Sequence, residues 1–291
     1  MLPLVAIILV NFNSYSDTIE CIKSIKNITY ENYKIVVVDN GSTKGDEKSI
    51  TFLKDNTYYI QSKINLGFSG GNNLGINFSK KKFSPDYYLL LNNDTIVKKD
   101  FLKFLVISAI NNYNTGIICG KICYFDEPEV IWFAGGSFNK KTGMADHIGY
   151  NKVDSNFEPF EKEIEFATGC MMLLPKFTIE KVGYLDEEYF LYAEDTDYSC
   201  RVRNAGLKII YNNLSVIYHK VSKSSQNNNL ITYYMVRNNL YIIKKYSNKK
   251  LYAYINEIIL MLKSVIKHEN SLKAILYGWI DFLKRKKGKK L

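Results

Sequence analysis

The sequence has little of what marks several common protein classes. Its five cysteines form no C-x-x-C pair, with no histidine or second cysteine pair nearby, so we expect reduced core thiols rather than zinc ligands or a disulfide scaffold. It contains neither G-x-G-x-x-G nor G-x-x-x-x-G-K-[ST], which argues against the usual dinucleotide fingerprint and an ATP-cradling loop. With 46% apolar residues in 291 positions, the chain can fill a core, which excludes disorder and collagen.

The sequence also lacks a recognisable secretion signal and a stretch that is long enough to cross a membrane. Met1–Val10 is apolar but has no basic leader or A-x-A cleavage site, and it runs directly into the polar Asn11 and Asn13. Leu251–Ile266 falls short of the roughly 20 apolar residues that a span needs, and charged residues interrupt it. We therefore expect a buried first strand and a cytoplasmic protein.

The net charge of +10 is confined to the C-terminal part of the chain. Lys244–Leu291 contains 13 basic and 3 acidic residues, whereas the remainder contains 26 of each. Because the body of the protein is neutral, we expect no nucleic-acid partner.

The same C-terminal part predicts helices and has two open interpretations. Residues 226–291 are expected to form a helical, basic extension of a catalytic domain at residues 1–225. The extension either packs on the domain and ends in a solvated tail, or lies on an anionic membrane, where each Lys or Arg contributes about 1 kcal/mol. Trp279 and the clustered basic residues favour the membrane, peripheral on the inner face of the plasma membrane. The predicted apolar face of the last helix consists of Leu272, Ile275, Leu276, Trp279, Ile280 and Leu283.

The first hundred residues alternate short apolar runs with helix-period segments. The runs are rich in Val, Ile and Leu without alternation, which is typical of strands that are covered on both faces. The pattern predicts an α/β fold with a mostly parallel sheet and flanking helices. The expected strands are Leu4–Val10, Lys34–Val38 and Tyr87–Leu91, and the expected helices are Thr18–Lys26, Asp46–Lys54 and Gly71–Lys81.

Polar residues follow each of these three strands. Any one of them is explained by a turn or a helix cap. Three at one sheet edge instead predict a ligand crevice, because strand ends in an open parallel sheet meet there. Asp39 can accept a hydrogen bond from a nucleobase, and Asp94 can bind a hard divalent cation together with diphosphate oxygens. The polar groups are Asn11 and Asn13, Asp39 and Asn40, and Asn92, Asn93 and Asp94.

Two later segments also carry candidate chemistry. Glu194, Asp195 and Asp197 lie at the start of a predicted helix, where they either stabilise the helix dipole or supply a general base. His219 ends an apolar stretch and is either a core histidine or a metal ligand. The glycine-rich Asn65–Gly75 would let the backbone approach a ligand closely.

Five strings together resemble glycosyltransferase family 2, of the GT-A (Rossmann-like) fold, especially its rhamnosyltransferase-like bacterial members. The resemblance covers roughly Leu4–Tyr246. In chain order the strings are VVVDNGS, NLGFSGGNN, LLLNND, ATGCMML and EDTDYSCR.

The resemblance implies an inverting, metal-dependent hexosyl transfer from a nucleoside-diphosphate sugar. Asp195 matches the catalytic base and Glu194 the residue that orients the acceptor. Asp94 and His219 match ligands of Mg²⁺ or Mn²⁺, and Asn92 stands where a full D-x-D element has Asp. The expected donor-binding residues are Asn11, Asn13, Asp39, Asn65, Gly67, Asn92 and Arg237.

The family resemblance also favours dTDP-rhamnose, with UDP-hexoses next, and a saccharide or lipid-linked acceptor of surface polysaccharide synthesis. Two alternatives remain. A sugar-phosphate nucleotidyltransferase should have a Gly-rich loop with a basic residue after the first strand, where Asn11–Ser14 stands. A non-catalytic nucleotide-sugar or glycan-binding protein would need the crevice at Asp39 but not Asp195.

Overall fold

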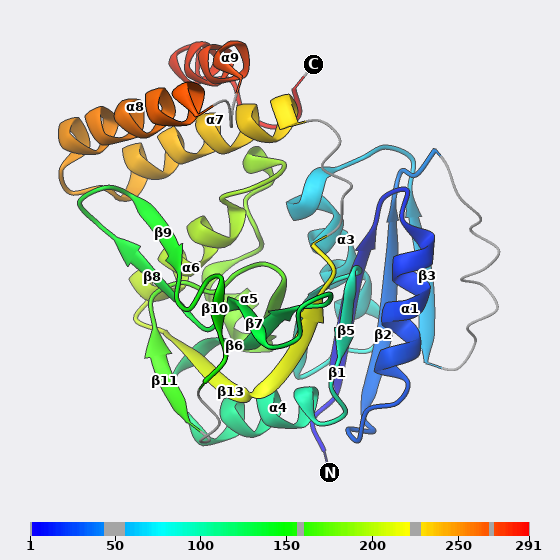
Figure 1. Ribbon diagram of the computed structural model, residues 1–291. Helices are drawn as coiled ribbons and strands as arrows, with labels where there is room; N and C mark the ends of the chain where they lie inside the picture. The colour runs from blue at the N-terminus through cyan, green and yellow to red at the C-terminus, as the bar shows by residue number, and fades with distance from the viewer. Residues whose placement is uncertain (1, 44–55, 156–159, 222–227, 268–270, 291) are drawn as a thin grey trace.

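The computed structural model describes residues 2–43, 56–155, 160–221, 228–267 and 271–290 (Figure 1). The helix expected at residues 46–54 lies outside these ranges. The described part is an α/β body around one large mixed sheet, with a layer of helices from the C-terminal part at one end (Figure 1).

The first half of the chain forms the parallel part of the sheet. β1 (Val5–Asn11) pairs in parallel with β2 (Tyr33–Asn40) and β4 (Tyr87–Asn92), and β2 pairs in parallel with β3 (Thr57–Ser62). The central strands are buried on both faces, as their uninterrupted apolar runs predicted. Asn11 is opposite Asp39 in the β1–β2 register, so the polar strand ends do meet at one edge.

The helices between these strands cover the sheet. α1 (Tyr15–Ile25) and α3 (Gly67–Lys82) both contact β1. Gly71 and Gly75 allow α3 to approach closely, because a Cβ on Gly75 would lie 2.4 Å from Cγ2 of Ile8 and one on Gly71 would lie 2.8 Å from Cγ1 of Val10. These two glycines of the Gly-rich segment therefore serve helix packing on the sheet, rather than approach to a ligand.

The second half of the chain adds antiparallel strands. β12 (Met171–Pro175) lies between β4 and β6 (Thr115–Tyr124) and is antiparallel to both. The long β13 (Lys208–His219) runs parallel to β6 and pairs with β5 (Thr95–Val97) and β11 (Glu161–Ile164). The remaining strands are β7 (Val130–Phe133), β8 (Gly136–Asn139), β9 (Met144–His147) and β10 (Lys152–Val153), and the helical elements here are α4 (Phe101–Asn111), α5 (Lys176–Val182), η1 (Glu187–Tyr189) and α6 (Glu194–Asn204).

The C-terminal helices are α7 (Asn228–Tyr246), α8 (Lys250–Ile266) and α9 (Leu272–Leu283). α7 packs on the body, and α8 and α9 pack on α7 (Figure 1). No helix of the described residues is long and apolar enough to cross a bilayer. Their shared core consists of Val236, Leu240, Ile243, Ala253, Met261 and Ile275.

Candidate active site

At the ends of β2 and β3, the Asp39 side chain is fully buried and surrounded by hydrogen-bond donors. Its Oδ2 accepts from Tyr59 Oη at 3.1 Å and from Gln61 Nε2 at 2.9 Å. Its Oδ1 accepts from Asn11 Nδ2 at 3.4 Å and from the Ser42 amide at 3.2 Å. Burial raises the pKa of Asp39, but these donors outweigh burial and hold it below its ordinary value, so the carboxylate is anionic.

The Oδ1 of Asp39 makes the longer hydrogen bonds, so a nucleobase would compete most easily with Asn11 and Ser42. Tyr59 and Gln61 were not predicted as site residues. They lie on β3, whose pairing with β2 puts Gln61 opposite Asp39. That register is the only signal that points to them.

The other expected donor-binding residues of this region have partners within the chain. Asn13 adopts a left-handed backbone (φ 56°), and its Oδ1 accepts from the Thr43 amide at 2.8 Å. Asn65 Oδ1 accepts from the Gly67 amide at 2.8 Å, which shapes the turn into α3. A Cβ on Gly67 would lie 2.2 Å from the Phe190 carbonyl, so this turn is held against the segment before α6. Donor binding by these residues stays a prediction.

At the end of β4, Asp94 and His219 come together although they are far apart in the sequence. β13 pairs with β5, and His219 is opposite Thr95 in that register. His219 Nε2 lies 3.2 Å from Asp94 Oδ1, and both side chains are almost completely buried. Asn92 precedes them and its carbonyl accepts from the Thr95 hydroxyl at 2.7 Å.

The Asp94 carboxylate and the His219 imidazole fit a divalent cation whose other ligands would come from the substrate. The His219 Nδ1 is buried with no hydrogen-bond partner among the described residues. Within the same residues no three His, Cys, Asp or Glu side chains gather as a metal cluster. Mg²⁺ in proteins is commonly held by one or two carboxylates plus substrate phosphates and water, which is what one carboxylate and one imidazole leave room for.

α6 begins at the two acidic residues that were expected to carry catalysis. Ala193 before them has a left-handed backbone (φ 69°), which turns the chain into the helix. Asp195 is half-buried, and its Oδ2 accepts from the Gly169 amide at 3.0 Å while its Oδ1 accepts from the Thr196 amide at 2.7 Å. Burial raises the pKa of Asp195 against the opposing effect of these hydrogen bonds.

Glu194 differs from its neighbour in being fully enclosed. Burial, and secondly the charge of Asp195, raise the pKa of Glu194 well above its ordinary value. Its Oε2 has no hydrogen-bond partner among the described residues. Of the two carboxyl groups, Glu194 is therefore the one whose protonated form its surroundings favour more strongly.

A short segment before β12 links Asp195 to the end of β4. The Gly169 amide binds Asp195, and the next residue, Cys170, accepts a hydrogen bond from the Asn92 amide at 3.0 Å. The charges of both Asp94 and Asp195 act on the buried Cys170 thiol, whose pKa burial raises well above its ordinary value. This segment therefore lies within the influence of both Asp94 and Asp195.

Asp197, the third acidic residue of the cluster, has a structural role. It is fully buried and accepts from Arg201 Nε at 2.7 Å, Lys245 Nζ at 2.5 Å and Tyr246 Oη at 2.6 Å. Burial raises the pKa of Asp197, but these partners outweigh it and hold the pKa below its ordinary value. Its contacts join α6 to α7 and separate it in role from Glu194 and Asp195.

His147, at the end of β9, was not predicted. Its ring packs edge-on against Trp132 at 4.7 Å between centroids, and Trp132 also packs edge-on against His219 at 4.8 Å. Burial lowers the pKa of His147, and the charge of Asp195 partly opposes this. No motif marked it, because a lone histidine in a strand carries no spacing signal.

The sequence predicted that Arg237 contacts the diphosphate of the donor, but in the structure its side chain is bound within the protein. Its side chain is 1% exposed and lies over the Tyr234 ring at 5.0 Å. Nη1 donates to the Gly288 carbonyl at 2.8 Å and Nη2 donates to the Tyr189 carbonyl at 3.2 Å. The structure therefore uses this guanidinium to hold η1 and the C-terminal tail, because its donors are already bound by the chain.

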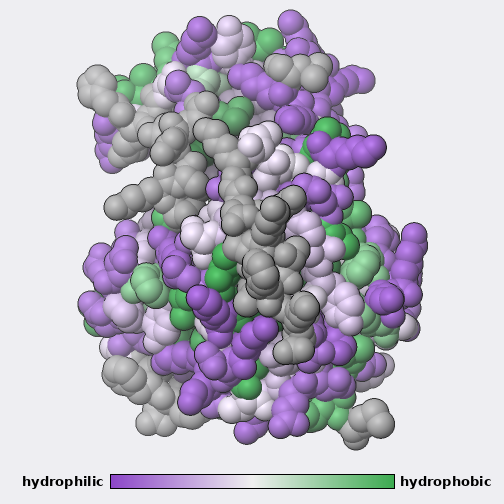
Figure 2. Space-filling view, turned by 90° about the vertical axis from the view of Figure 1, so that its right-hand side faces the viewer, coloured by the Kyte–Doolittle hydropathy of each residue, from purple (hydrophilic) through white to green (hydrophobic). Residues whose placement is uncertain are grey.

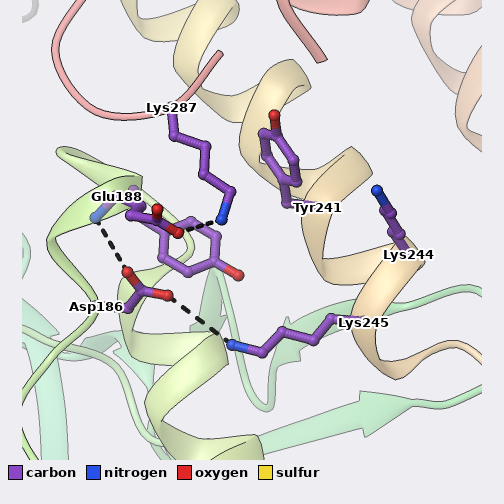
Figure 3. A pocket seen from close by; sticks show the side chains of 7 residues that line it. Asp186, Glu188, Tyr241, Lys244, Lys245 and Lys287 are labelled. Carbon is purple, nitrogen blue, oxygen red and sulfur yellow. Dashed lines mark hydrogen bonds and ion pairs between the residues drawn. The ribbon is translucent and has the colours of Figure 1, made fainter. Parts of the chain in front are cut away.

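A cavity of about 400 Å³ lies between η1, α7 and the tail and is lined by none of the predicted site residues (Figure 3). Lys287 forms an ion pair with Glu188 across the cavity, and Lys245 Nζ lies 3.9 Å from Asp186 Oδ2. The first pair joins the C-terminal tail to η1, and the second joins α7 to the residue before η1. The lining residues are Asp186, Glu188, Tyr189, Tyr241, Lys244, Lys245 and Lys287.

Comparison with known proteins identifies a family and supports the fold. Residues 6–183 match the model of glycosyl transferase family 2. The chain is 30% identical to the low-salt glycan biosynthesis hexosyltransferase Agl10 of Haloferax volcanii, over 72% of this chain and 64% of that protein. It is 28% identical to the rhamnosyltransferase WbbL of Escherichia coli, over 72% of this chain and 80% of that protein.

Among solved structures, the chain is similar to GalNAc-T7, crystallised with UDP, GalNAc and Mn²⁺. The TM-score is 0.61 at 16% identity, and the match covers 75% of this chain and 43% of that one. This likeness concerns the fold alone, and it confirms the α/β GT-A architecture expected from the sequence.

Proposed function

Because the chain belongs to glycosyl transferase family 2, we propose that it transfers a hexosyl residue from a nucleoside-diphosphate sugar to a saccharide or lipid-linked acceptor in surface polysaccharide synthesis. We propose dTDP-rhamnose as the donor, supported by the likeness to a rhamnosyltransferase, with UDP-hexoses as the second class, supported by the likeness to a hexosyltransferase. One observation carries the proposal: Asp195 is hydrogen-bonded to the segment that also binds the end of β4, where Asp94 and His219 meet.

The donor half of the proposed site is formed by the strand ends. Asp39 is an anion held in place by four donors, and we assign it the base N–H of the nucleotide. Asn11 lies opposite Asp39 at the end of β1, and Asn92 ends β4 on the other side of β1. Asn13, Asn65 and Gly67 border the same edge. Asp94 and His219 would hold Mg²⁺ or Mn²⁺, which when bound offsets the negative charge that develops on the departing diphosphate.

The acceptor half is formed by the start of α6. We propose that Asp195 removes the proton of the acceptor hydroxyl as the new bond forms, on the face opposite the leaving diphosphate, so that the anomeric configuration inverts. A carboxylate is a weak base for an alcohol, so the proton moves late. Burial strengthens this base, because it raises the pKa of Asp195. Glu194, protonated beside it, can donate a hydrogen bond that orients the acceptor.

The proposed organisation places the catalytic domain at residues 1–225 and a helical extension at residues 226–291. Burial of the α7 residues Arg237 and Asn238 against η1 supports tight attachment of this extension. We propose that the enzyme works in the cytoplasm at the inner face of the plasma membrane, where a lipid-linked acceptor would be presented.

A donor screen with product analysis tests the proposed function. Thermal unfolding with nucleotide sugars and Mn²⁺ should show a stabilisation of about 2.7 kcal/mol when a ligand is present at roughly 100 times its dissociation constant. The stabilising donor should then be hydrolysed slowly in the absence of acceptor, releasing nucleoside diphosphate. Stabilisation without hydrolysis or transfer would indicate a binding protein, and release of pyrophosphate from a nucleoside triphosphate and a sugar phosphate would indicate a nucleotidyltransferase.

A further inference from the structure

α8 carries a continuous stripe of exposed aliphatic side chains. Leu251 and Ile266, at its two ends, are 76% and 75% exposed. The spacings of four, three, one, three and four residues place the whole stripe on one side of the helix. The opposite side, with Ala253, Glu257 and Met261, is buried. The stripe consists of Leu251, Ile255, Ile258, Ile259, Leu262 and Ile266.

α9 repeats this arrangement. Leu272, Leu276, Ile280 and Leu283 are exposed at spacings of four, four and three, and Leu283 is 70% exposed. The other side packs on α7 at Gly278, where a Cβ would lie 2.7 Å from Cγ1 of Val236. The face predicted for this helix is therefore divided: Ile275 is buried and Trp279 half-buried, while the four leucines and isoleucines are exposed.

The two helices contact each other, so their stripes belong to one layer. The Trp279 indole N–H of α9 lies 3.1 Å from Sδ of Met261 on α8, and Tyr254 on α8 packs against Phe282 on α9. Both helices are buried toward α7, so the stripes point away from the helix that joins them to the body. At the end of the molecule that α8 and α9 form, Figure 2 shows hydrophobic residues at the surface between hydrophilic ones.

Exposed lysines border the stripes. Lys263 on α8, Lys273 on α9 and Lys284 directly after α9 are exposed and lie next to stripe residues in the sequence. In contrast, part of the basic tail that follows α9 is bound to the protein itself. Lys287 forms an ion pair with Glu188, and Lys286 Nζ lies 3.2 Å from Asp281 Oδ1. The tail is therefore less available for a partner than the sequence alone indicated, and the helices present the better surface.

Charge decides which partner covers this apolar layer. Lys244–Leu291 carries 13 basic and 3 acidic residues, so a second copy would bring like charges together around the contact. An anionic partner is complementary. A surface with aliphatic residues at its centre and lysines around it fits the boundary between acyl chains and anionic headgroups.

We propose that the exposed stripes of α8 and α9 form a docking surface for an anionic lipid bilayer. The leucine and isoleucine side chains enter the acyl boundary, and the neighbouring lysines bind the phosphate groups of the lipids. The enzyme lies on the bilayer through these helices without crossing it. This docking surface is independent of the transfer reaction, because it includes none of the proposed catalytic or donor-binding residues.

Vesicle flotation with the full chain tests this surface. The wild type should bind vesicles of phosphatidylcholine mixed with phosphatidylglycerol, and bind vesicles of phosphatidylcholine alone much more weakly. Ile255→Glu with Ile259→Glu should lower the partition by at least about tenfold, because two aliphatic side chains that would enter the acyl boundary are lost and negative charge is added. Both positions are exposed and glutamate is a good helix former, so the fold should be kept.

A matched control is Ile110→Glu, since Ile110 is 60% exposed on α4, at the other end of the molecule (Figure 1). It should bind vesicles like the wild type. Lys263→Gln with Lys273→Gln should weaken binding and flatten its salt dependence. Donor hydrolysis without membranes should be unchanged in every variant, which separates a failure of docking from a failure of the proposed function.

Two results would overturn the docking proposal. One is equal vesicle binding by the wild type and the Ile255→Glu, Ile259→Glu variant. The other is a wild type that ignores anionic vesicles but forms a dimer in light scattering that this variant dissociates, which would assign the surface to a second copy.

Discussion

His219 Nε2 lies 3.2 Å from Asp94 Oδ1, and this contact joins the last residue of β13 to the second of the two residues between β4 and β5. The two atoms are close enough to hydrogen bond directly or to flank one cation. The contact exists because β13 pairs with β5, so the sheet itself sets the spacing of the proposed metal ligands.

Removing the Asp94 carboxylate should abolish the effect of metal on donor binding. In Asp94→Ala, calorimetry with a nucleotide sugar should give the same weak affinity with and without Mn²⁺, whereas the wild type should bind more tightly with Mn²⁺. His219→Gln should show a smaller loss of the same kind. Full metal-dependent affinity in Asp94→Ala would remove Asp94 from the metal site.

Replacing the proposed base should slow the reaction without preventing donor binding. Asp195→Asn can still accept the Gly169 hydrogen bond through its side-chain oxygen, but it cannot take up a proton. We expect kcat to fall by roughly 10²–10⁴, the usual contribution of general-base catalysis, with an unchanged thermal shift by donor. Turnover equal to the wild type would show that another group is the base.

Glu194 should make stability depend on pH in a definite direction. Because its pKa is higher in the folded state, its contribution to folding is complete below about 4.5 and is lost as the pH rises toward the folded pKa. Glu194→Gln removes this titration, so it should be more stable than the wild type by about 1 kcal/mol or more at neutral pH and not at acidic pH.

Urea unfolding of the Glu194→Gln variant and the wild type across the acidic to neutral range measures this effect. Asp195→Asn is the paired control, because burial also raises the pKa of Asp195 and its hydrogen bonds oppose the rise. It should give a smaller difference of the same sign. A stability difference for Glu194→Gln that stays constant with pH would mean that Glu194 does not titrate as a buried acid.

The contact of α3 with the sheet should not tolerate a larger residue at Gly75. The added methyl of Gly75→Ala would overlap Cγ2 of the fully buried Ile8, and such overpacking typically costs 1–3 kcal/mol, so we expect a loss of about 2 kcal/mol in unfolding free energy. Asn77→Ala, at an exposed position of the same helix, should be neutral or slightly stabilising. Chemical denaturation of both variants compares the two effects, and equal stability would place the helix farther from the sheet.

Much of the fold can be predicted from local patterns in the sequence. Uninterrupted Val, Ile and Leu runs require cover on both faces, so they predicted the parallel strands and the helices over them. Polar residues directly after those runs predicted which sheet edge could bind a ligand, because parallel strands end together. Five short strings were enough to recognise the family.

Other features depended on pairings between distant segments, which no local pattern encodes. The β2–β3 register brought Gln61 to Asp39, and the β5–β13 pair brought His219 to Asp94. Arg237 was expected at the diphosphate, but the packing of α7 on η1 and the returning tail took up its donors.

The sequence by itself determined which segments must be buried and which residue types stand at the strand ends, because burial and strand ends follow from the pattern of neighbouring residues. Tertiary structure decided which of those polar groups meet and how far their pKa values move, because both depend on the solvent and charges that remain after distant segments pack. Tertiary structure also decided which half of the apolar face of α9 stays exposed. Ile275 is buried against α7, whereas Leu276 and Ile280 remain in solvent.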